Sequence, residues 1–266
     1  MLHHKTNGFA AKMKKWGYSS LSTLLFFAVW YALSAAGILN AGIIPGPEKV
    51  IARLFTNLFA TDQFAVHVLP TIRRAALGFA MALGIGLAVA FLLESVLRFL
   101  RPVVIPIMHF LEKLNPIALF PVFMLFWGIG ELSKVLIIFW VVVWLIAFHT
   151  IEGIENVNPV FIQSAKSMGA RRATLLFKVY LPAAGPDIFL GIRLGASIAF
   201  IFVISVEMLS ASAGLGWFVQ HAKHQYNLPN LYSCVILVAI IGLLVSALMN
   251  RIERRAFAWK QDAIQQ

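Results

Sequence analysis

Six apolar runs that carry no charge recur along the chain and constrain its fold more than any other feature. They are Leu21–Leu39, Ala75–Leu93, Leu114–Gly130, Val135–Ile151, Leu194–Val206 and Leu231–Asn250. A helix needs about 17–25 residues to cross the hydrocarbon core of a bilayer, and most of these runs reach that length alone or with their flanks. Only 12% of the 266 residues are charged, about half the fraction found in soluble domains. The sequence therefore predicts an all-α, polytopic membrane protein with six transmembrane helices.

The positions of the basic residues predict the orientation of these spans. Most of the 22 Lys and Arg residues lie in the N-terminal tail, the second loop, the central loop and the C-terminal tail. Basic loops stay on the cytoplasmic side of a membrane. We therefore expect a cytoplasmic tail at 1–20, a transmembrane domain at 21–251 and a second cytoplasmic tail at 252–266. Arg73, Arg74 and Lys134 are expected in loops on the opposite side.

The net charge of +11 could also indicate a nucleic-acid partner. That interpretation is the weaker one, because no basic stripe interleaves with aromatic residues in any soluble segment. We expect lipid rather than nucleic acid around this chain.

The central loop begins with signals for a short helix. Asn158 is a good N-cap, and Pro159 suits the first helical position, where its missing N–H has no partner to lose. The helix should run to about Met168, where Gly169 supplies the left-handed residue that ends it and turns the chain. The pattern predicts a second helix from Arg171 to about Val179, ending at Leu181-Pro182. We call residues 158–182 the elbow.

Two interpretations of the elbow are open. The stretch Gln163–Pro182, "QSAKSMGARRATLLFKVYLP", carries four positive charges, so its helices could lie on lipid headgroups as an ordinary basic loop. That interpretation does not account for the sharp Gly turn and the Leu-Pro stop. A rigid projecting segment of this kind suits docking into a groove of another protein.

The elbow resembles a motif of the permease subunits of bacterial ATP-binding-cassette importers, which carry E-A-A-x3-G-x9-I-x-L-P in this loop. The match is Gln163-Ser164-Ala165, then Gly169, then Val179-Tyr180-Leu181-Pro182, with Gln163, Ser164 and Val179 departing from the family's residue types. Loss of the family's Glu at Gln163 removes one negative charge. The resemblance implies that the residues coupling the chain to an ATPase are Gln163, Ser164, Ala165, Gly169, Ala170, Arg171, Leu181 and Pro182.

The resemblance covers most of the chain, which is similar to the nitrate/sulfonate/taurine-type permeases. The segments that carry it are "IPGPEKV", "WGIGELSKVLII", "GIRLGASIAF", "VEMLSASAGLGW" and "RIERRAFAW", in this order. It implies the type I importer permease fold, in which the elbow is a cytoplasmic coupling helix. The family's partners are two copies of an ABC ATPase subunit, a second permease chain, expected here as a homodimer, and an extracytoplasmic substrate-binding protein.

The resemblance also implies a cellular location for this chain and ATP binding by a partner subunit. We expect a multi-pass protein of the bacterial inner membrane that imports a small polar solute by alternating access. The chain has no G-x-x-x-x-G-K-[ST] phosphate loop, so ATP and Mg²⁺ are expected on the partner ATPase. We expect no enzyme activity, no cofactor and no metal site in this chain.

Four residues are candidates for the substrate pathway: Glu112, Lys113, Asn115 and Glu207. Ionisable groups within spans usually face a cavity or a partner group. Similar permeases tend to read R-P-x-P near Glu112, so this departure leaves the substrate of the chain open. Glu112 and Lys113 could instead form an internal pair. Glu207 could instead pair with a basic or amide group from a neighbouring helix.

A self-sufficient secondary transporter or channel is the alternative function. Such proteins often show internal repeats and interrupted helices. The prolines between 102 and 121 are compatible with an interrupted helix, and they predict that this segment is not straight. The absence of a repeat and the presence of the elbow favour the importer.

Overall fold

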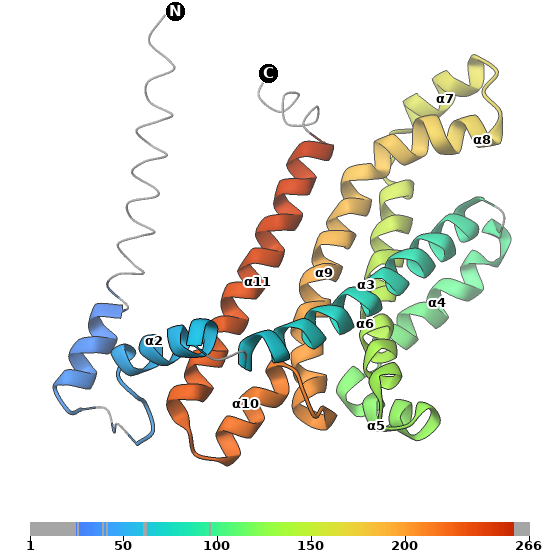
Figure 1. Cartoon of the computed structure of the whole chain (residues 1–266). Coiled ribbons are helices and arrows are strands. Elements are labelled where there is room, and N and C mark those ends of the chain that lie inside the picture. The colour runs from blue at the N-terminus through green and yellow to red at the C-terminus, as the bar shows by residue number, and fades with distance from the viewer. Residues whose placement is uncertain are drawn as a thin grey trace, which may run out of the picture. The chain divides into compact units, whose positions relative to one another are not determined.

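The computed structural model describes residues 25, 27–38, 40, 42–60, 63–95 and 97–257, and every regular element in this part of the chain is helical (Figure 1). The chain divides into two compact units. One contains residues up to Gln63 together with Val219–Ile236, and the other contains Phe64–Phe218 together with the residues from Leu237 on. The predicted tail at 1–20 lies outside the described residues.

The first unit contains helix α2 (Pro47–Phe55), the π-helical turn η1 (Thr56–Ala60), the end of α10 (Leu215–His224) and the start of α11 (Leu228–Ala256). Val50 and Leu54 are buried on one face of α2, whereas Leu58, which shares their helical spacing, is exposed. The Nδ2 of buried Asn57 donates to Asn230 Oδ1 at 3.1 Å. The buried face of this helix is therefore held by a polar contact as well as by apolar packing.

The second unit holds the remaining helices. They are α3 (Gln63–Ser95), η2 (Arg98–Leu100), α4 (Arg101–Glu112), α5 (Pro116–Trp127), α6 (Glu131–Glu155), α7 (Pro159–Ser167), α8 (Arg172–Leu175), the π-helical turn η3 (Leu176–Tyr180) and α9 (Leu181–Ser210). The unit begins one residue into α3, and α10 and α11 each pass from one unit to the other. α11 continues to Ala256, so the predicted C-terminal tail at 252–266 begins as helix.

Four described helices are long and apolar enough to cross a membrane: Val66–Ser95, Glu131–Glu155, Leu176–Ser210 and Leu228–Ala256. The run Leu114–Gly130, whose prolines predicted a helix that is not straight, does not form a membrane-spanning helix by itself. Its helical part, α5, has 12 residues and meets Arg98–Glu112 at a bend of 95°, so that the two together make at most one broken span. The first predicted span, Leu21–Leu39, lies partly outside the described residues.

The bend between α4 and α5 follows from local sequence. Asn115 caps α5 by accepting hydrogen bonds from the backbone N–H groups of Ile117 and Ala118, at 3.0 and 3.4 Å. Pro116 stands at the start of α5, where its fixed φ suits a helix that begins afresh. An N-cap residue has non-helical backbone angles, so the cap interrupts the helix. The predicted break in the proline-rich segment is confirmed.

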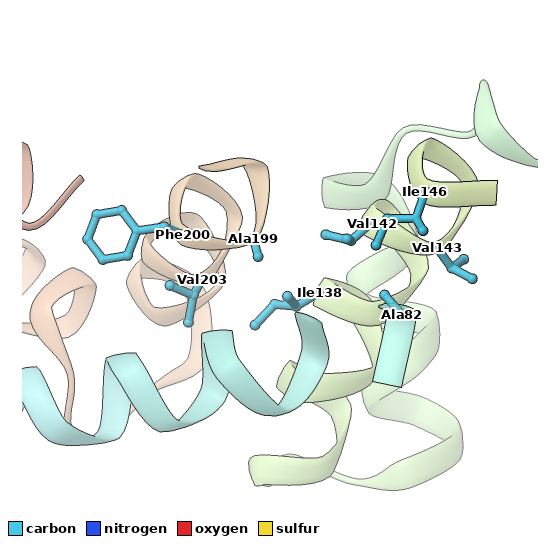
Figure 2. Close-up of a cluster of buried hydrophobic side chains, with 8 residues drawn as sticks. All are labelled: Ala82, Ile138, Val142, Val143, Ile146, Ala199, Phe200 and Val203. Atoms are coloured by element: carbon cyan, nitrogen blue, oxygen red, sulfur yellow. The ribbon is translucent and has the colours of Figure 1, made fainter. Parts of the chain in front are cut away.

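The core of the second unit lies where α6 packs against α3 and α9. Figure 2 shows its buried side chains: Ala82, Ile138, Val142, Val143, Ile146, Ala199, Phe200 and Val203. Two glycines permit a close approach here. A Cβ at Gly86 would lie 3.0 Å from the Val143 carbonyl oxygen, and one at Gly191 would lie 2.6 Å from His149 Cβ. These glycines let α6 pack closely against both α3 and α9.

Candidate functional site

The first helix of the elbow is built as its sequence predicts. Asn158 Oδ1 accepts from the Val160 N–H at 2.9 Å, and Pro159 opens α7. At the other end, Gly169 has φ +76°. The Gly169 N–H donates to the Lys166 carbonyl at 2.9 Å, and the Ala170 N–H donates to the Ala165 carbonyl at 3.0 Å. These two bonds make a Schellman motif, which satisfies the last carbonyls of the helix.

The elbow presents apolar side chains to its surroundings. Val160, Phe161 and Met168 are all exposed, Met168 to 87%. Basic Lys166 and Arg171 are exposed beside them. Ile162 packs instead against a buried cluster at the junction of α6 and α9, which anchors the elbow to the membrane-spanning helices. The exposed apolar side chains suit a protein partner, which would cover them and exclude water.

The residues that match the permease motif fall on different parts of the elbow. Gln163, Ser164, Gly169 and Arg171 are exposed, and Ala165 and Ala170 are half-buried. Leu181 packs against the cluster at the base of the elbow, and Pro182 is exposed.

The sequence predicted that the second helix of the elbow ends at Leu181-Pro182. That prediction is wrong. Helical backbone continues from α8 through η3 into α9, where Pro182 occupies the first turn. A proline has no N–H to donate within a helix. The π-helical turn just before it shifts the hydrogen-bond register, and the helix continues through the proline without ending. In Figure 1, α7 and α8 lie side by side at one end of α9.

Glu207 lies near the opposite end of α9, and its side chain has 0% exposure. Its carboxylate accepts from Arg74 Nη1 at 2.6 Å, from the Thr71 hydroxyl at 2.8 Å and from the Gly216 N–H at 3.0 Å. We call Glu207, Arg74, Thr71 and Glu131 the Glu207 cluster.

Arg74 joins two carboxylates within this cluster. Its Nε and Nη2 donate to the two oxygens of Glu131, at 2.7 and 2.6 Å, while its Nη1 donates to Glu207. Arg73 and Lys134 approach Glu131 as well, each at 3.5 Å. A planar guanidinium suits such paired contacts better than an ammonium does. The cluster therefore ties α3 to α6 and α9 through charge-assisted hydrogen bonds.

The turn after α9 wraps over Glu207. Gly214 has φ +128°, and a Cβ there would meet the Glu207 carboxyl group. A Cβ at Gly216 would meet the backbone carbonyl of Ile204. Only residues without a side chain fit both positions. The glycines of "SAGLGW" therefore allow the backbone to approach the buried carboxylate.

The other pathway candidates form a separate group at the bend between α4 and α5. Lys113 Nζ lies 3.2 Å from Glu112 Oε2, and the Lys113 side chain is 76% exposed. His109 Nδ1 lies 3.6 Å from the same carboxylate oxygen. Asn115 is occupied as the cap of α5. Glu112 thus has an internal pair, as Glu207 does, but it also has the solvent access that Glu207 lacks.

A cavity of about 170 Å³ lies among α3, α4 and α6. Its lining side chains are aliphatic, aromatic or methionine, with Ile85, Met108, Trp140 and Trp144 among them. A polar solute would lose hydrogen bonds to water there without gaining replacements. We assign it no role in binding a polar substrate.

Sequence reasoning singled out Glu207 but missed its partners. Arg74 and Lys134 were expected in loops, yet both are buried in helices. Arg74 and Glu207 are 133 residues apart, beyond any helical spacing. One available signal was Thr71 and Arg74 ahead of an apolar run, because an arginine that close to a span needs a partner.

Residues 80–257 match the family described as "Binding-protein-dependent transport system inner membrane component". A probable ABC transporter permease of Brucella abortus (strain 2308) is 30% identical over 95% of this chain and 99% of its own length. A putative aliphatic sulfonates transport permease of Bacillus subtilis is 27% identical over 97% of this chain and 95% of its own. The taurine transport system permease of Escherichia coli K12 is 28% identical over 90% of this chain and 89% of its own.

Solved structures share the fold. The methionine ABC transporter MetNI in inward-facing conformations matches with a TM-score of 0.64 and 20% identity, over 71% of this chain and 94% of that one. A bacterial alginate ABC transporter in complex with an alginate-pentasaccharide-bound periplasmic protein matches with a TM-score of 0.63 and 14% identity, over 92% and 96%. The fold is that of ABC transporter membrane subunits.

Proposed function

Because this chain belongs to the family of binding-protein-dependent transport system inner membrane components, we propose that its elbow receives a separate ATPase subunit. The exposed apolar side chains of α7, next to a Gly turn fixed by backbone hydrogen bonds, carry this proposal. ATP and Mg²⁺ then bind to the partner. Closure of two ATPase subunits pushes on the elbow, and the spans rock between two states.

The same proposal assigns the remaining partners. Two copies of the permease chain form the pathway, and a substrate-binding protein delivers a small polar solute on the side away from the elbow. The alginate transporter, whose structure includes a periplasmic protein, supports a binding-protein partner. The basic elbow and termini favour a cytoplasmic position for both ends of the chain, in a bacterial inner membrane.

Reconstitution tests this function. We expect the purified chain alone to hydrolyse no ATP and to transport nothing, and the ATPase subunit that copurifies from the native membrane to restore both activities. Phe161→Asp should abolish association with that subunit, because it places a charge on the docking face. Ile129→Asp is the matched control, since Ile129 is 82% exposed and lies before α6, whereas the elbow follows it. Robust gradient-driven uptake by the chain alone would contradict the importer and support the secondary transporter.

Within this function, we assign Glu112, Lys113 and Asn115 to the solute pathway. They lie at a break of the α4–α5 pair, where backbone groups freed from the helix need water or protein partners. Exposure of Lys113 in the single chain leaves it available to a solute. Glu207 is not assigned to the pathway, because its carboxylate is buried and already accepts hydrogen bonds from Arg74, Thr71 and Gly216.

A double-mutant cycle separates a pathway role from simple pairing. If these residues line the path, Glu112→Gln and Lys113→Met each change solute affinity or selectivity while assembly with the ATPase survives. If they only pair, each single change destabilises the protein and the double change recovers the loss. The second pattern would remove them from the pathway.

A further inference from the structure

The elbow and the Glu207 cluster are joined by one helix. Helical backbone runs without a gap from Arg172 to Ser210, and α9 alone has 30 residues, or about 45 Å at 1.5 Å per residue. A push on the elbow therefore reaches the other end of α9 through a stiff element. What happens there depends on how α9 is connected to its surroundings at Glu207.

The backbone of the turn after α9 is held mainly by side chains of other elements. The four consecutive residues held in this way are the last two of the turn and the first two of α10. The Ala213 carbonyl accepts from Arg74 Nη1 at 2.7 Å, and the Gly214 N–H donates to His67 Nδ1 at 3.2 Å. The Leu215 N–H donates to the Thr71 hydroxyl at 2.9 Å, and the Gly216 N–H donates to Glu207.

These contacts make the shape of the turn conditional on the helices. His67, Thr71 and Arg74 lie on successive turns of one face of α3, whereas Glu207 lies on α9. If α9 shifts against α3, the four bonds cannot all keep their lengths. The turn must then move with the helix ends or break its bonds.

We propose that Glu207 and Thr71 are positioning residues, which make the turn after α9 and the start of α10, residues 211–216, move as one body with the ends of α3 and α9 when the elbow is displaced. This inference rests on the proposed function of the elbow. Through Arg74, Glu131 brings the end of α6 into the same body. The position of the turn, at the far end of α9, therefore changes with the nucleotide state of the ATPase.

A label on the turn tests this directly and needs no knowledge of the solute. Ser212 is exposed and Cys234 is buried, so Ser212→Cys in a Cys234→Ser chain takes one environment-sensitive fluorophore. The complex with its copurified ATPase is compared without nucleotide and after trapping with ATP and vanadate. The wild-type cluster should give a fluorescence change on trapping.

Two variants weaken the cluster without removing bulk. Glu207→Gln keeps an acceptor but removes the charge that faces Arg74. Thr71→Val removes the hydroxyl between the Leu215 N–H and Glu207 while leaving the ion pair. Each should lower the equilibrium constant for the coupled turn about tenfold, the weight of one charge-assisted hydrogen bond, and so reduce the fluorescence change, while ATP hydrolysis stays within about twofold of wild type.

The matched control is a second ion pair of the same helix. Arg193 Nη1 lies 2.8 Å from Glu253 of α11, and Arg193→Met removes that pair without touching the turn. It should leave the fluorescence change intact. An equal loss in Arg193→Met would overturn the proposal, because any weakening of α9 would then suffice. If Glu207→Gln does not assemble, Thr71→Val decides alone.

Two results separate this inference from the proposed function. A wild-type complex that hydrolyses ATP but shows no fluorescence change on trapping overturns the role of the turn and leaves the elbow's function standing. So does an unchanged signal in both Glu207→Gln and Thr71→Val. A chain that neither binds an ATPase subunit nor depends on one overturns the proposed function itself.

Discussion

The two ends of α9 are held in opposite ways. At the elbow, hydrogen bonds between residues close in sequence fix the chain, and most side chains of α7 stay exposed: the Asn158 side chain caps α7, and backbone bonds around Gly169 close it. At the Glu207 cluster, side chains distant in sequence fix the backbone, and Thr71, Arg74 and Glu207 are themselves buried. A surface that another protein must recognise needs a rigid backbone with free side chains. A contact that ties helices of one chain together uses its side chains for hydrogen bonds within that chain.

This difference predicts where mutations act. Changes at the cluster should lower the stability of the chain itself, because they leave buried charges or N–H groups without partners. Changes at the elbow should leave that stability nearly intact and act on binding of the partner. The following substitutions test this contrast, from the largest expected effect to the smallest.

Arg74→Met should give the largest loss. It leaves the Glu207 carboxylate buried without a cation, and breaking a buried pair in this way costs about 3–5 kcal/mol. SDS titration of the purified chain measures the free energy of unfolding. Arg193→Met, at a half-buried pair, should lose less than half as much. Equal stability of Arg74→Met and the wild type would show that the cluster does not hold the helices.

Gly169→Val should come next, and its effect should be confined to the elbow. Gly169 has φ +76° with no atom within 4 Å of an added Cβ, so the strain is purely in the backbone, about 1–3 kcal/mol. ATPase association should fail while the chain still inserts into the membrane. Gly169→Asn should keep more association, because Asn tolerates the left-handed region. Full transport activity in Gly169→Val would mean that the turn is not needed.

Asn158→Ala should cost about 1 kcal/mol, the usual value of an N-cap. The Val160 N–H loses its acceptor, so the amides of the first turn of α7 should exchange faster with solvent. Asn115→Ala removes the equivalent cap of α5 and should leave α7 exchange unchanged. Amide exchange in α7 that is unchanged by Asn158→Ala would contradict an elbow held by local hydrogen bonds.

Phe161→Ala should have the smallest effect on stability. The side chain is 58% exposed, and substitutions at such positions usually stay within about 0.5 kcal/mol. Binding of the ATPase subunit should nevertheless weaken, as a pull-down would measure. A large loss of stability in Phe161→Ala, with binding unaffected, would reverse the contrast between the two regions.

The elbow was predictable from sequence because its signals are local. Asn158, Pro159 and Gly169 act within a few residues of themselves, through capping and a positive φ. The end of the second helix was predicted wrongly, since a proline ends a helix only if the hydrogen-bond register before it stays α-helical. The π-helical turn Leu176–Tyr180 shifts that register, and the sequence pattern does not reveal it.

The Glu207 cluster was predictable only in part. A carboxylate in an apolar run predicts a partner, but Arg74 and Glu131 could be identified only from the packing of three helices. The 95° bend was also predictable only in part. The prolines predicted a broken helix, but the angle of the break depends on how α4 and α5 pack in the folded chain. Spans were predicted well where one run made one helix, and poorly at the run Leu114–Gly130, which contains only α5 of the broken α4–α5 pair.

The two carboxylates around Arg74 have a consequence for the order in which the chain is made. Glu131 follows Arg74 by 57 residues and Glu207 follows it by 133. At a synthesis rate of about 5–20 residues per second, Arg74 waits about 3–11 s for Glu131 and about 7–27 s for Glu207. Glu131 therefore becomes the first counter-ion of Arg74, while α9 has yet to leave the ribosome. Glu131 can therefore pair with the Arg74 charge during insertion, and Glu207 adds α9 to the helices already present.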